Sequence, residues 1–192
     1  MTETITCPFS WGRHFFPSNP TYGGSSVRVG YELNPSGSGQ TRSLIKFDFS
    51  NLATIPENKI LSVELNMYVD AFYGVSNMDT AFHEVLKAAT NQANWNTYNG
   101  TAAWSVGGCG GSGTDYYETP LAEKLWNTTG WGSINIDLAV FKATLSNNHS
   151  ISLRPTSPDI SEETQLVVFN NSTYPPYLEV TIRPGSSYIM MF

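Results

Sequence analysis

Hydrophobic and polar residues alternate one by one along several segments of this chain. Because successive side chains of a β-strand point to opposite faces, such alternation predicts strands with one buried face. The clearest run covers residues 61–70, and a second covers residues 41–49. We expect these two runs to be neighbouring strands of an antiparallel sheet. The apolar side of the first run consists of Leu61, Val63, Leu65, Met67 and Val69.

Shorter alternating runs follow along the chain and predict further strands at 25–32, 80–87, 121–126, 151–153, 165–169 and 177–183. Apolar residues at three- and four-residue steps predict one short helix over residues 137–145, with Asp137 at its N-terminal end. Turns or loops are expected at 34–40, 71–78 and 128–133. About ten short strands with at most one short helix predict an all-β, jelly-roll-type antiparallel β-sandwich.

The two ends of the chain differ in composition from this single domain, which we place at residues 25–183. Prolines at positions 8, 17 and 20 argue against a central strand in residues 1–24, so an aromatic arm is expected there. Residues 184–192 form an apolar tail. The arm and the tail either pack on the domain or dock on a partner, and the residues proposed for docking are Trp11, Phe15, Phe16, Tyr188, Ile189, Met190, Met191 and Phe192.

A long segment without periodicity, residues 88–120, interrupts the pattern of strands. Segments of this length inside a compact domain are usually functional or packed by their own side chains. Aromatic rings stack on sugar rings, and amide groups hydrogen-bond sugar hydroxyls. The segment therefore holds candidate glycan-binding residues, although Trp95 and Trp104 also suit a core of its own. The candidates are Tyr98, Trp104, Tyr116, Tyr117, Asn96 and Asn99.

Composition and charge exclude some classes of function. Only 14% of the 192 residues are charged, and the formal net charge is −6. Lys and Arg are scattered, which argues against binding of a nucleic-acid backbone. The first residues lack the basic and apolar regions of a signal peptide, and no apolar run is long enough to span a bilayer. A virion-surface or extracellular protein is expected.

Candidate catalytic and metal-binding residues are few. Cys109 lies within Gly107–Gly111, which formally matches a nucleophile elbow, but the residues that follow do not favour the helix that such an elbow requires. A glycine turn is the better interpretation, and no catalytic residue is assigned. With only two cysteines, Cys7 and Cys109, free thiols are expected rather than a disulfide framework. A structural Ca²⁺ remains an option, with Asp115 and Asp79 as the best donors; no other cofactor is expected.

Six motifs in this order resemble one family. They are NPTYGGSSVRVGY, TRSLIKFDFSNL, ILSVELNMYV, NWNTYNGTAAWSVGGCGGSGTDYY, INIDLAVFKATLSNNHSISLRP and YPPYLEVTI. Together, over residues 18–183, they resemble the DNRLRE-type domains, which are related to disaggregatase repeats and to some carbohydrate-binding modules. The resemblance implies a jelly-roll sandwich without catalytic residues, of a kind found beside polysaccharide-active enzymes, on cell surfaces and in phage structural proteins.

These observations lead to one expected function and one alternative. The expected function is a non-catalytic virion-surface protein, such as a capsid decoration or fibre-associated protein of a phage. It would contact virion proteins or itself as a homo-oligomer, and its surface would bind glycans. The alternative is a polysaccharide-binding module that accompanies a secreted polysaccharide-active enzyme. An enzyme on a jelly roll, with carboxylates such as Glu84, Asp115 and Glu118, is the third option.

Overall fold

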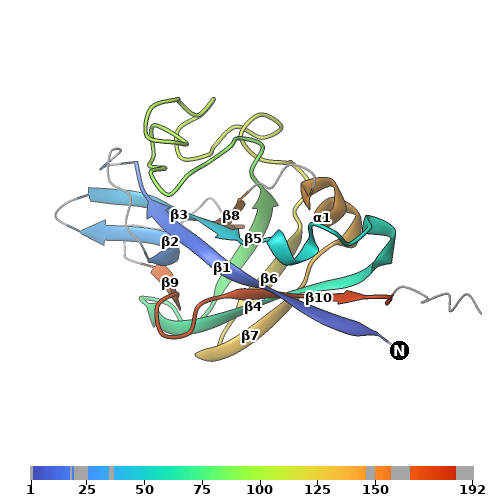
Figure 1. Cartoon of the computed structure of the whole chain (residues 1–192). Helices are drawn as coiled ribbons and strands as arrows, with labels where there is room; N and C mark the ends of the chain where they lie inside the picture. The colour runs from blue at the N-terminus through green and yellow to red at the C-terminus, as the bar shows by residue number, and fades with distance from the viewer. Residues whose placement is uncertain are drawn as a thin grey trace, which may run out of the picture.

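The computed structural model of the chain describes residues 2–17, 19, 26–34, 37–145, 150–156 and 165–184. Ten β-strands, one α-helix and two 3-10 turns make up the regular structure of this described part (Figure 1). The strands are β1 (Glu3–Phe15), β2 (Val27–Asn34), β3 (Gly37–Phe47), β4 (Ile60–Tyr73), β5 (Met78–Glu84), β6 (Ala122–Trp126), β7 (Gly130–Asn135), β8 (Ile151–Pro155), β9 (Gln165–Asn170) and β10 (Tyr177–Ile182). The helix α1 spans Leu138–Leu145, and the turns are η1 (Ser50–Leu52) and η2 (Glu57–Lys59). The prediction of an all-β, sandwich-like protein is confirmed.

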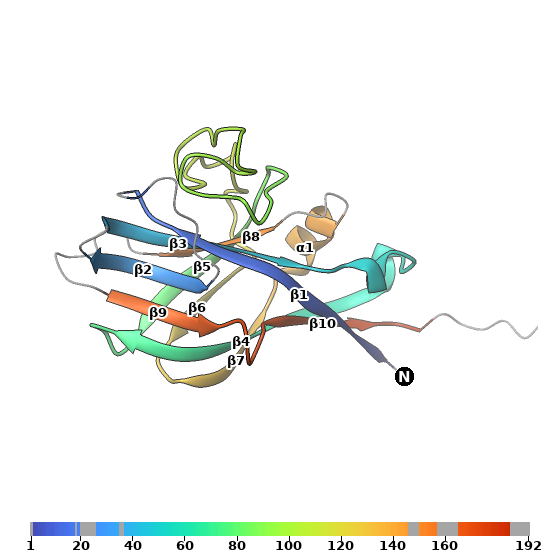
Figure 2. The ribbon, with the colours of Figure 1, turned by 60° about the vertical axis from the view of Figure 1, so that its left-hand side comes forward.

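All strand pairings are antiparallel, in the order β1-β10-β4-β9-β2-β3-β8-β5-β6, with β7 paired to β4. The first layer contains β10, β4, β7, β9 and β2, and the second contains β8, β5 and β6. Figure 2 shows β3, β2, β9 and β4 following one another, with β8 and β5 behind. Two strands belong to both layers. The first half of β1 pairs with β10 and its second half with β3, while β3 pairs first with β2 and then with β8.

The hydrophobic core lies between the two layers. Val63, Leu65, Met67 and Val69 of β4 are buried, as their alternation predicts. Burying an aliphatic side chain of this size contributes about 1.5–3 kcal/mol, so these four positions fix which face of β4 points inward. Leu61 is an exception because it is 37% exposed. The pairing with β10 shifts register between Thr181 and Ile182, and this shift puts Ile60 in the core in place of Leu61.

The sequence suggested that β3 and β4 are neighbouring strands, but they do not pair with each other. β4 pairs with β10, β9 and β7, whereas β3 pairs with β1, β2 and β8. The residues between them, 48–59, contain η1 and η2 and carry the chain from one layer to the other. Alternation identifies the strands correctly but says nothing about which strand lies beside which.

The predicted N-terminal arm is wrong, because residues 3–15 form the long central strand β1. Pro8 makes the last pair with β10, just before the register shift between Phe9 and Trp11. Proline is tolerated at such irregular positions of a sheet. Phe15 and Phe16 are buried, and Trp11 packs against the same cluster as Phe15, so Phe15 and Phe16 do not form a docking surface.

Three other expectations have mixed outcomes. Residues 37–40 and 130–133 belong to strands β3 and β7 rather than to loops. The helix is confirmed, and Asp137 Oδ1 accepts a hydrogen bond from the N–H of Ala139 at its start. The tail residues proposed for docking, Tyr188, Ile189, Met190, Met191 and Phe192, lie outside the described residues. Within the described part, no helix has the length and apolarity to cross a membrane.

Candidate functional site

Residues 85–121, here called the long loop, connect β5 to β6 and lie over the second layer at one end of the molecule (Figures 1 and 2). The loop has a small core of its own with the outer faces of β1 and β3. Phe15 lies 6.3 Å from the ring of Trp95 and 6.4 Å from that of Trp104. The side chains of the loop therefore pack against one another and against these two strands. The buried residues of this core are Phe15, Leu44, Val85, Ala89, Ala93, Trp104 and Cys109.

Asp115 holds the long loop together. Its buried carboxylate accepts hydrogen bonds from the backbone N–H groups of Ser105, Val106 and Gly111, at 2.8–2.9 Å. Burial alone would raise the pKa of Asp115, but these donors outweigh it and hold the pKa below its usual value. The carboxylate therefore acts as an anionic anchor for two stretches of the loop backbone, residues 105–106 and residue 111.

Half of the predicted glycan-binding residues serve the loop itself. Trp104 is 5% exposed and donates its Nε1–H to the carbonyl of Asn94, and Tyr98 packs against its ring at 5.6 Å. Asn99 Oδ1 accepts backbone N–H groups of Thr101 and Ala102, which closes a turn. Trp104 is therefore wrong as a sugar-stacking residue.

The three remaining candidates in the long loop are more accessible. Asn96 and Tyr117 are exposed, and Tyr117 is 46% exposed. Tyr116 is half-buried and lies against the ring of His83 at 4.8 Å. No ring contact joins Tyr117 to another described aromatic residue, so the loop does not present a continuous aromatic surface.

Cys109 does not resemble an activated nucleophile. Its thiol is fully buried, and burial raises its pKa to about 12. Its φ of +57° follows the positive φ of Gly108, which is the glycine turn expected from the sequence. Cys7 is also buried, and both cysteines are free. A thiol with such a raised pKa is almost entirely protonated at neutral pH.

The proposed calcium donors do not come together. The Asp115 carboxylate already accepts hydrogen bonds from the three backbone N–H groups described above. Asp79 is an exposed residue of β5. Among the described residues, no group of three or more His, Cys, Asp or Glu is arranged to hold a metal ion. Calcium binding by Asp115 and Asp79 stays a prediction, and the loop backbone already hydrogen-bonds both oxygens of Asp115.

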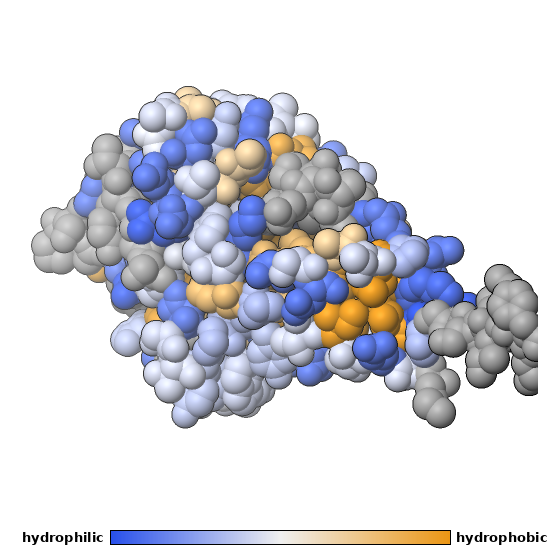
Figure 3. All heavy atoms as spheres, viewed as in Figure 1, coloured by the Kyte–Doolittle hydropathy of each residue, from blue (hydrophilic) through white to orange (hydrophobic). Residues whose placement is uncertain are grey.

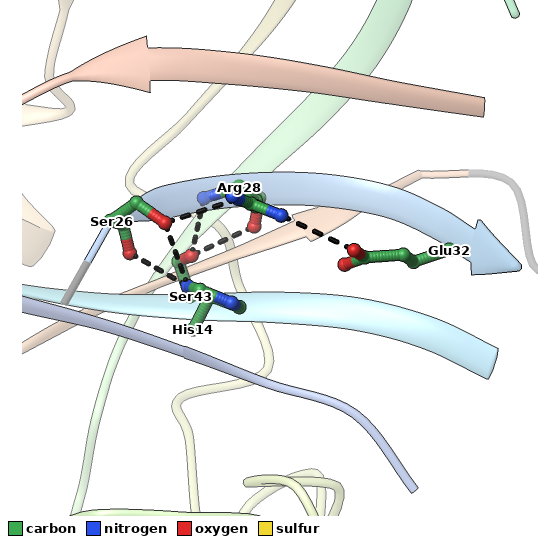
Figure 4. Close-up of polar contacts among 5 residues, drawn as sticks. All are labelled: His14, Ser26, Arg28, Glu32 and Ser43. Atoms are coloured by element: carbon green, nitrogen blue, oxygen red, sulfur yellow. Dashed lines mark hydrogen bonds and ion pairs between the residues drawn. The ribbon is translucent and has the colours of Figure 1, made fainter. Parts of the chain in front are cut away.

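A buried polar cluster links β1, β2 and β3 (Figure 4). His14 Nδ1 lies 3.1 Å from the carbonyl oxygen of Ser26 and 3.0 Å from its hydroxyl. Ser43 donates its hydroxyl to the carbonyl of Arg28, whose guanidinium pairs with Glu32 at 3.2 Å. Burial lowers the pKa of His14 to about 4, so the imidazole is neutral at physiological pH. These contacts join the three strands.

A groove of about 720 Å³ lies between β1 and η1. Its apolar lining includes Phe9, Phe49, Leu52 and Ile55. On the face drawn in Figure 3, hydrophilic residues predominate, and a hydrophobic area lies beside the N-terminal half of β1. The groove contains none of the residues predicted to bind glycan.

An exposed aromatic surface lies on the first layer, where the sequence analysis placed no site. We call Tyr68, Trp131, Tyr174 and Tyr177 the aromatic face. Trp131 is 50% exposed and Tyr174 is 43% exposed. The ring of Trp131 lies 5.6 Å from Tyr68, 6.2 Å from Tyr174 and 5.5 Å from Tyr177, while Tyr68 and Tyr174 stack at 4.4 Å.

Strand pairing explains how these rings meet. Trp131 of β7 is directly opposite Tyr68 of β4. β9 and β10 pair one after the other with β4, and residues 171–176 between them make no ladder pairs. Tyr174 lies in this gap and Tyr177 follows it. In the sequence, only the position of Tyr68 on the polar side of its strand pointed to the aromatic face. Trp131 was missed because residues 128–133 were expected to form a turn.

Polar side chains surround the aromatic face. Asn66 is paired with Tyr177 on one side and Ser133 on the other, and Glu64 is paired with Glu179 and Asn135 in the next row. Ser133 and Asn135 are exposed. A half-exposed tryptophan among tyrosines, with amides, hydroxyls and carboxylates nearby, is a typical composition for a surface that binds a polar molecule with apolar faces.

The fold and these surfaces define an all-β, sandwich-like protein with an exposed aromatic face on one layer and a packed long loop on the other. Comparison with protein-family models and with curated proteins finds no match to this chain.

Proposed function

We propose that this protein is a non-catalytic glycan-binding protein and that the aromatic face binds the sugar. The observation that carries the proposal is the half-exposed ring of Trp131 in contact with three tyrosine rings. An isolated exposed tryptophan would need no explanation, but here four aromatic rings cluster at the surface.

The chemistry of pyranose sugars suits this surface. One face of a pyranose ring presents C–H groups that pack on an aromatic ring, while its rim carries hydroxyls that require hydrogen bonds. The neighbouring Ser133, Asn135 and Glu64 supply donors and acceptors for such hydroxyls. The contacts between the rings also hold them in place, which reduces the entropy lost on binding.

The proposal predicts that Trp131→Ala weakens glycan binding. Native gels cast with soluble polysaccharides, among them hydroxyethyl cellulose, xylan and mixed-linkage β-glucan, measure the retardation of the protein. We expect at least one of these to retard the wild type and Trp131→Ala to lower that affinity about tenfold or more, since the lost ring contact is worth about 1–2 kcal/mol.

Tyr73→Ala is the matched control. Tyr73 is 54% exposed on the same strand as Tyr68 but makes no ring contact with the aromatic face. This control should be retarded as strongly as the wild type. Absence of retardation of the wild type by every polysaccharide, or equal retardation of all three proteins, would contradict the proposal.

Attachment to a virus particle stays a prediction from the sequence. It is compatible with a glycan-binding surface, because a protein on the outside of a particle meets surface polysaccharides. Copurification of the protein with assembled particles tests this location independently of sugar binding.

A further inference from the structure

We propose that a second site, formed by Arg42 and Arg154 beside the long loop, binds the carboxylate of a small acidic sugar. This site goes beyond the function proposed above, because it lies on the other layer and has a different chemistry. β7, which carries Trp131, lies away from the long loop in both ribbon views (Figures 1 and 2). The two sites are therefore separate surfaces.

The register of the sheet brings the two arginines together. Ser43 of β3 is paired with Leu153 of β8, so Arg42 and Arg154 occupy the next cross-strand positions. Arg154 is in turn paired with Ala81, and Ala81 with Glu123. Because Ala81 has a small side chain, this row leaves a pocket of about 360 Å³ at the edge of the long loop. A volume of this size accommodates a monosaccharide.

Both guanidinium groups are held in place by the long loop. Arg42 donates Nη1–H to the carbonyl of Gly108 at 3.0 Å, and its Nε and Nη2 donate to Gln40 Oε1. Arg154 donates Nη2–H to the carbonyl of Cys109, and its Cζ lies 3.7 Å from the centre of the Tyr116 ring. Such fixed guanidinium groups lose little entropy when they bind an anion.

Among the described residues, neither arginine has a carboxylate partner. Every hydrogen bond that the described structure gives to these two guanidinium groups goes to a carbonyl, an amide oxygen or a hydroxyl. Burial lowers the pKa of both arginines, and the charge of Arg154 lowers that of Arg42 further, to about 10; the charge of Asp115 acts in the opposite direction on the pKa of Arg154. Two half-buried like charges destabilise the fold unless an anion compensates them.

Donors remain available for that anion. Nη1 of Arg154 makes no hydrogen bond in the described part, whereas its Nε, which has no partner there either, is buried from solvent. The N–H groups of Nη1 can donate to a carboxylate oxygen. Glu123 is exposed at the opposite side of the pocket. Together with the two arginines, it gives the pocket lining a net positive charge of one unit.

The rest of the pocket fits the hydroxyls of a sugar. His83 Nδ1 lies 2.9 Å from the carbonyl of Tyr117, which accepts only, so Nδ1 carries the proton and Nε2 is an acceptor. Burial, followed by the charge of Arg154, lowers the pKa of His83 and favours this neutral form. Gln40, Glu123 and Thr156 add polar groups to the lining. A hexuronate combines the required carboxylate with several hydroxyls.

An NMR titration of the full chain tests this site. Three probes are used: D-glucuronate, D-glucose, which lacks the charge, and inorganic sulfate, which lacks the ring. We expect glucuronate to shift the Arg42 and Arg154 side-chain Nε–H signals with saturation at millimolar concentration. Glucose should leave these signals unchanged, and sulfate should bind at least fivefold more weakly than glucuronate.

Variants separate binding from folding. Arg154→Gln should lower glucuronate affinity at least tenfold, and Arg183→Gln, a change of an exposed arginine outside the pocket, should leave it unchanged. Because Arg154 also supports the loop, Glu123→Gln provides a second arm without that role. It removes the negative charge from the rim and should raise the affinity about threefold.

Several results would overturn the proposal. One is the absence of saturable glucuronate shifts in the wild type, and another is an unchanged affinity in Glu123→Gln. Sulfate binding as tight as glucuronate would show a site for an adventitious ion only. None of these results depends on Trp131, so the failure of this site and of the aromatic face are distinguishable.

Discussion

At the scale of single residues, buried polar side chains build the parts of this protein that strand ladders do not reach. Asp115 gathers three backbone N–H groups of the long loop, and Arg42 and Arg154 tie the carbonyls of Gly108 and Cys109 to the sheet. A loop without periodic structure thereby has its backbone groups paired. The side chains that seemed suited to ligands or metals instead satisfy this need.

Asp115→Asn should destabilise the protein by about 2–4 kcal/mol, because hydrogen bonds to a charged acceptor are lost and an amide N–H₂ faces backbone donors. Urea denaturation followed by circular dichroism measures this difference. Asp79→Asn, at an exposed position, should change the stability by less than about 0.5 kcal/mol. Equal stability of the two variants would show that the Asp115 carboxylate does not anchor the loop.

His14 should make the protein less stable in mild acid. Its pKa falls from 6.5 to about 4 on folding because of burial, so the unfolded chain binds the proton more readily. The stability that the neutral imidazole contributes is fully present above pH 6.5 and decreases as the pH falls towards 4, by up to about 3 kcal/mol. Denaturation at pH 7.5 and 4.5 measures the loss.

His14→Asn is the variant that checks this assignment, since an amide Nδ2–H replaces the Nδ1–H donor without titrating. The variant should lose less stability between pH 7.5 and 4.5 than the wild type. His83, whose pKa burial also lowers, accounts for a smaller remaining loss. Identical pH dependence in both proteins would rule out His14 as the source.

At the scale of elements, strand interiors were predictable and strand ends were not. The alternation at Val63, Leu65, Met67 and Val69 reports burial directly, because only one face of the strand contacts the core. β1 was not predicted because Pro8 argued against a strand. Pro8 in fact lies at the irregular position where β1 passes from one layer to the other.

The same limit explains why the aromatic face was missed. Trp131 lies between Gly130 and Gly132, which suggest a turn, yet all three belong to β7. Gly132 is needed there because a Cβ atom would approach the buried ring of Trp126 to 2.6 Å. The glycine reflects close packing of a side chain from another strand, which no local pattern reveals.

Gly30→Ala tests the pairing of β2 with β9. Gly30 has a φ of +137°, and an added Cβ would lie 2.0 Å from the backbone oxygen of Gln165. We expect the substitution to cost at least about 3 kcal/mol or to prevent folding, because that backbone oxygen belongs to the paired strand. Thermal unfolding or the yield of soluble protein measures this.

Gly113→Ala serves as the comparison for this prediction. Gly113 also has a positive φ, of +70°, but nothing lies within 4 Å of an added Cβ. Only the intrinsic cost of the left-handed conformation applies, about 1 kcal/mol. Similar stabilities of the two variants would argue against the close approach of β2 and β9.

At the scale of the whole molecule, the two layers have different outer surfaces. The long loop covers much of the second layer and leaves the arginine pocket at its edge, whereas the first layer exposes the aromatic face. Two sugar-binding surfaces of different chemistry would let one small protein hold a branched or acidic polysaccharide at two points, which increases the overall affinity through effective concentration.

The sequence predicted the fold class of this molecule but not its candidate site. Aromatic residues are concentrated in 94–117, and composition alone cannot distinguish rings that fill a core from rings that face solvent. Trp104 and Trp131 have the same chemistry, and only the arrangement of strands makes one 5% and the other 50% exposed. Placing a site on this protein therefore required its tertiary structure.

The most direct test of the proposed function is a chemical-shift map of the protein titrated with an oligosaccharide of whichever polysaccharide retards it in native gels. We predict that the largest shifts fall on Tyr68, Trp131, Tyr174 and Tyr177. Shifts centred instead on Tyr98 and Tyr117 of the long loop, with the Trp131 indole signal unchanged, would contradict the assignment of glycan binding to the aromatic face.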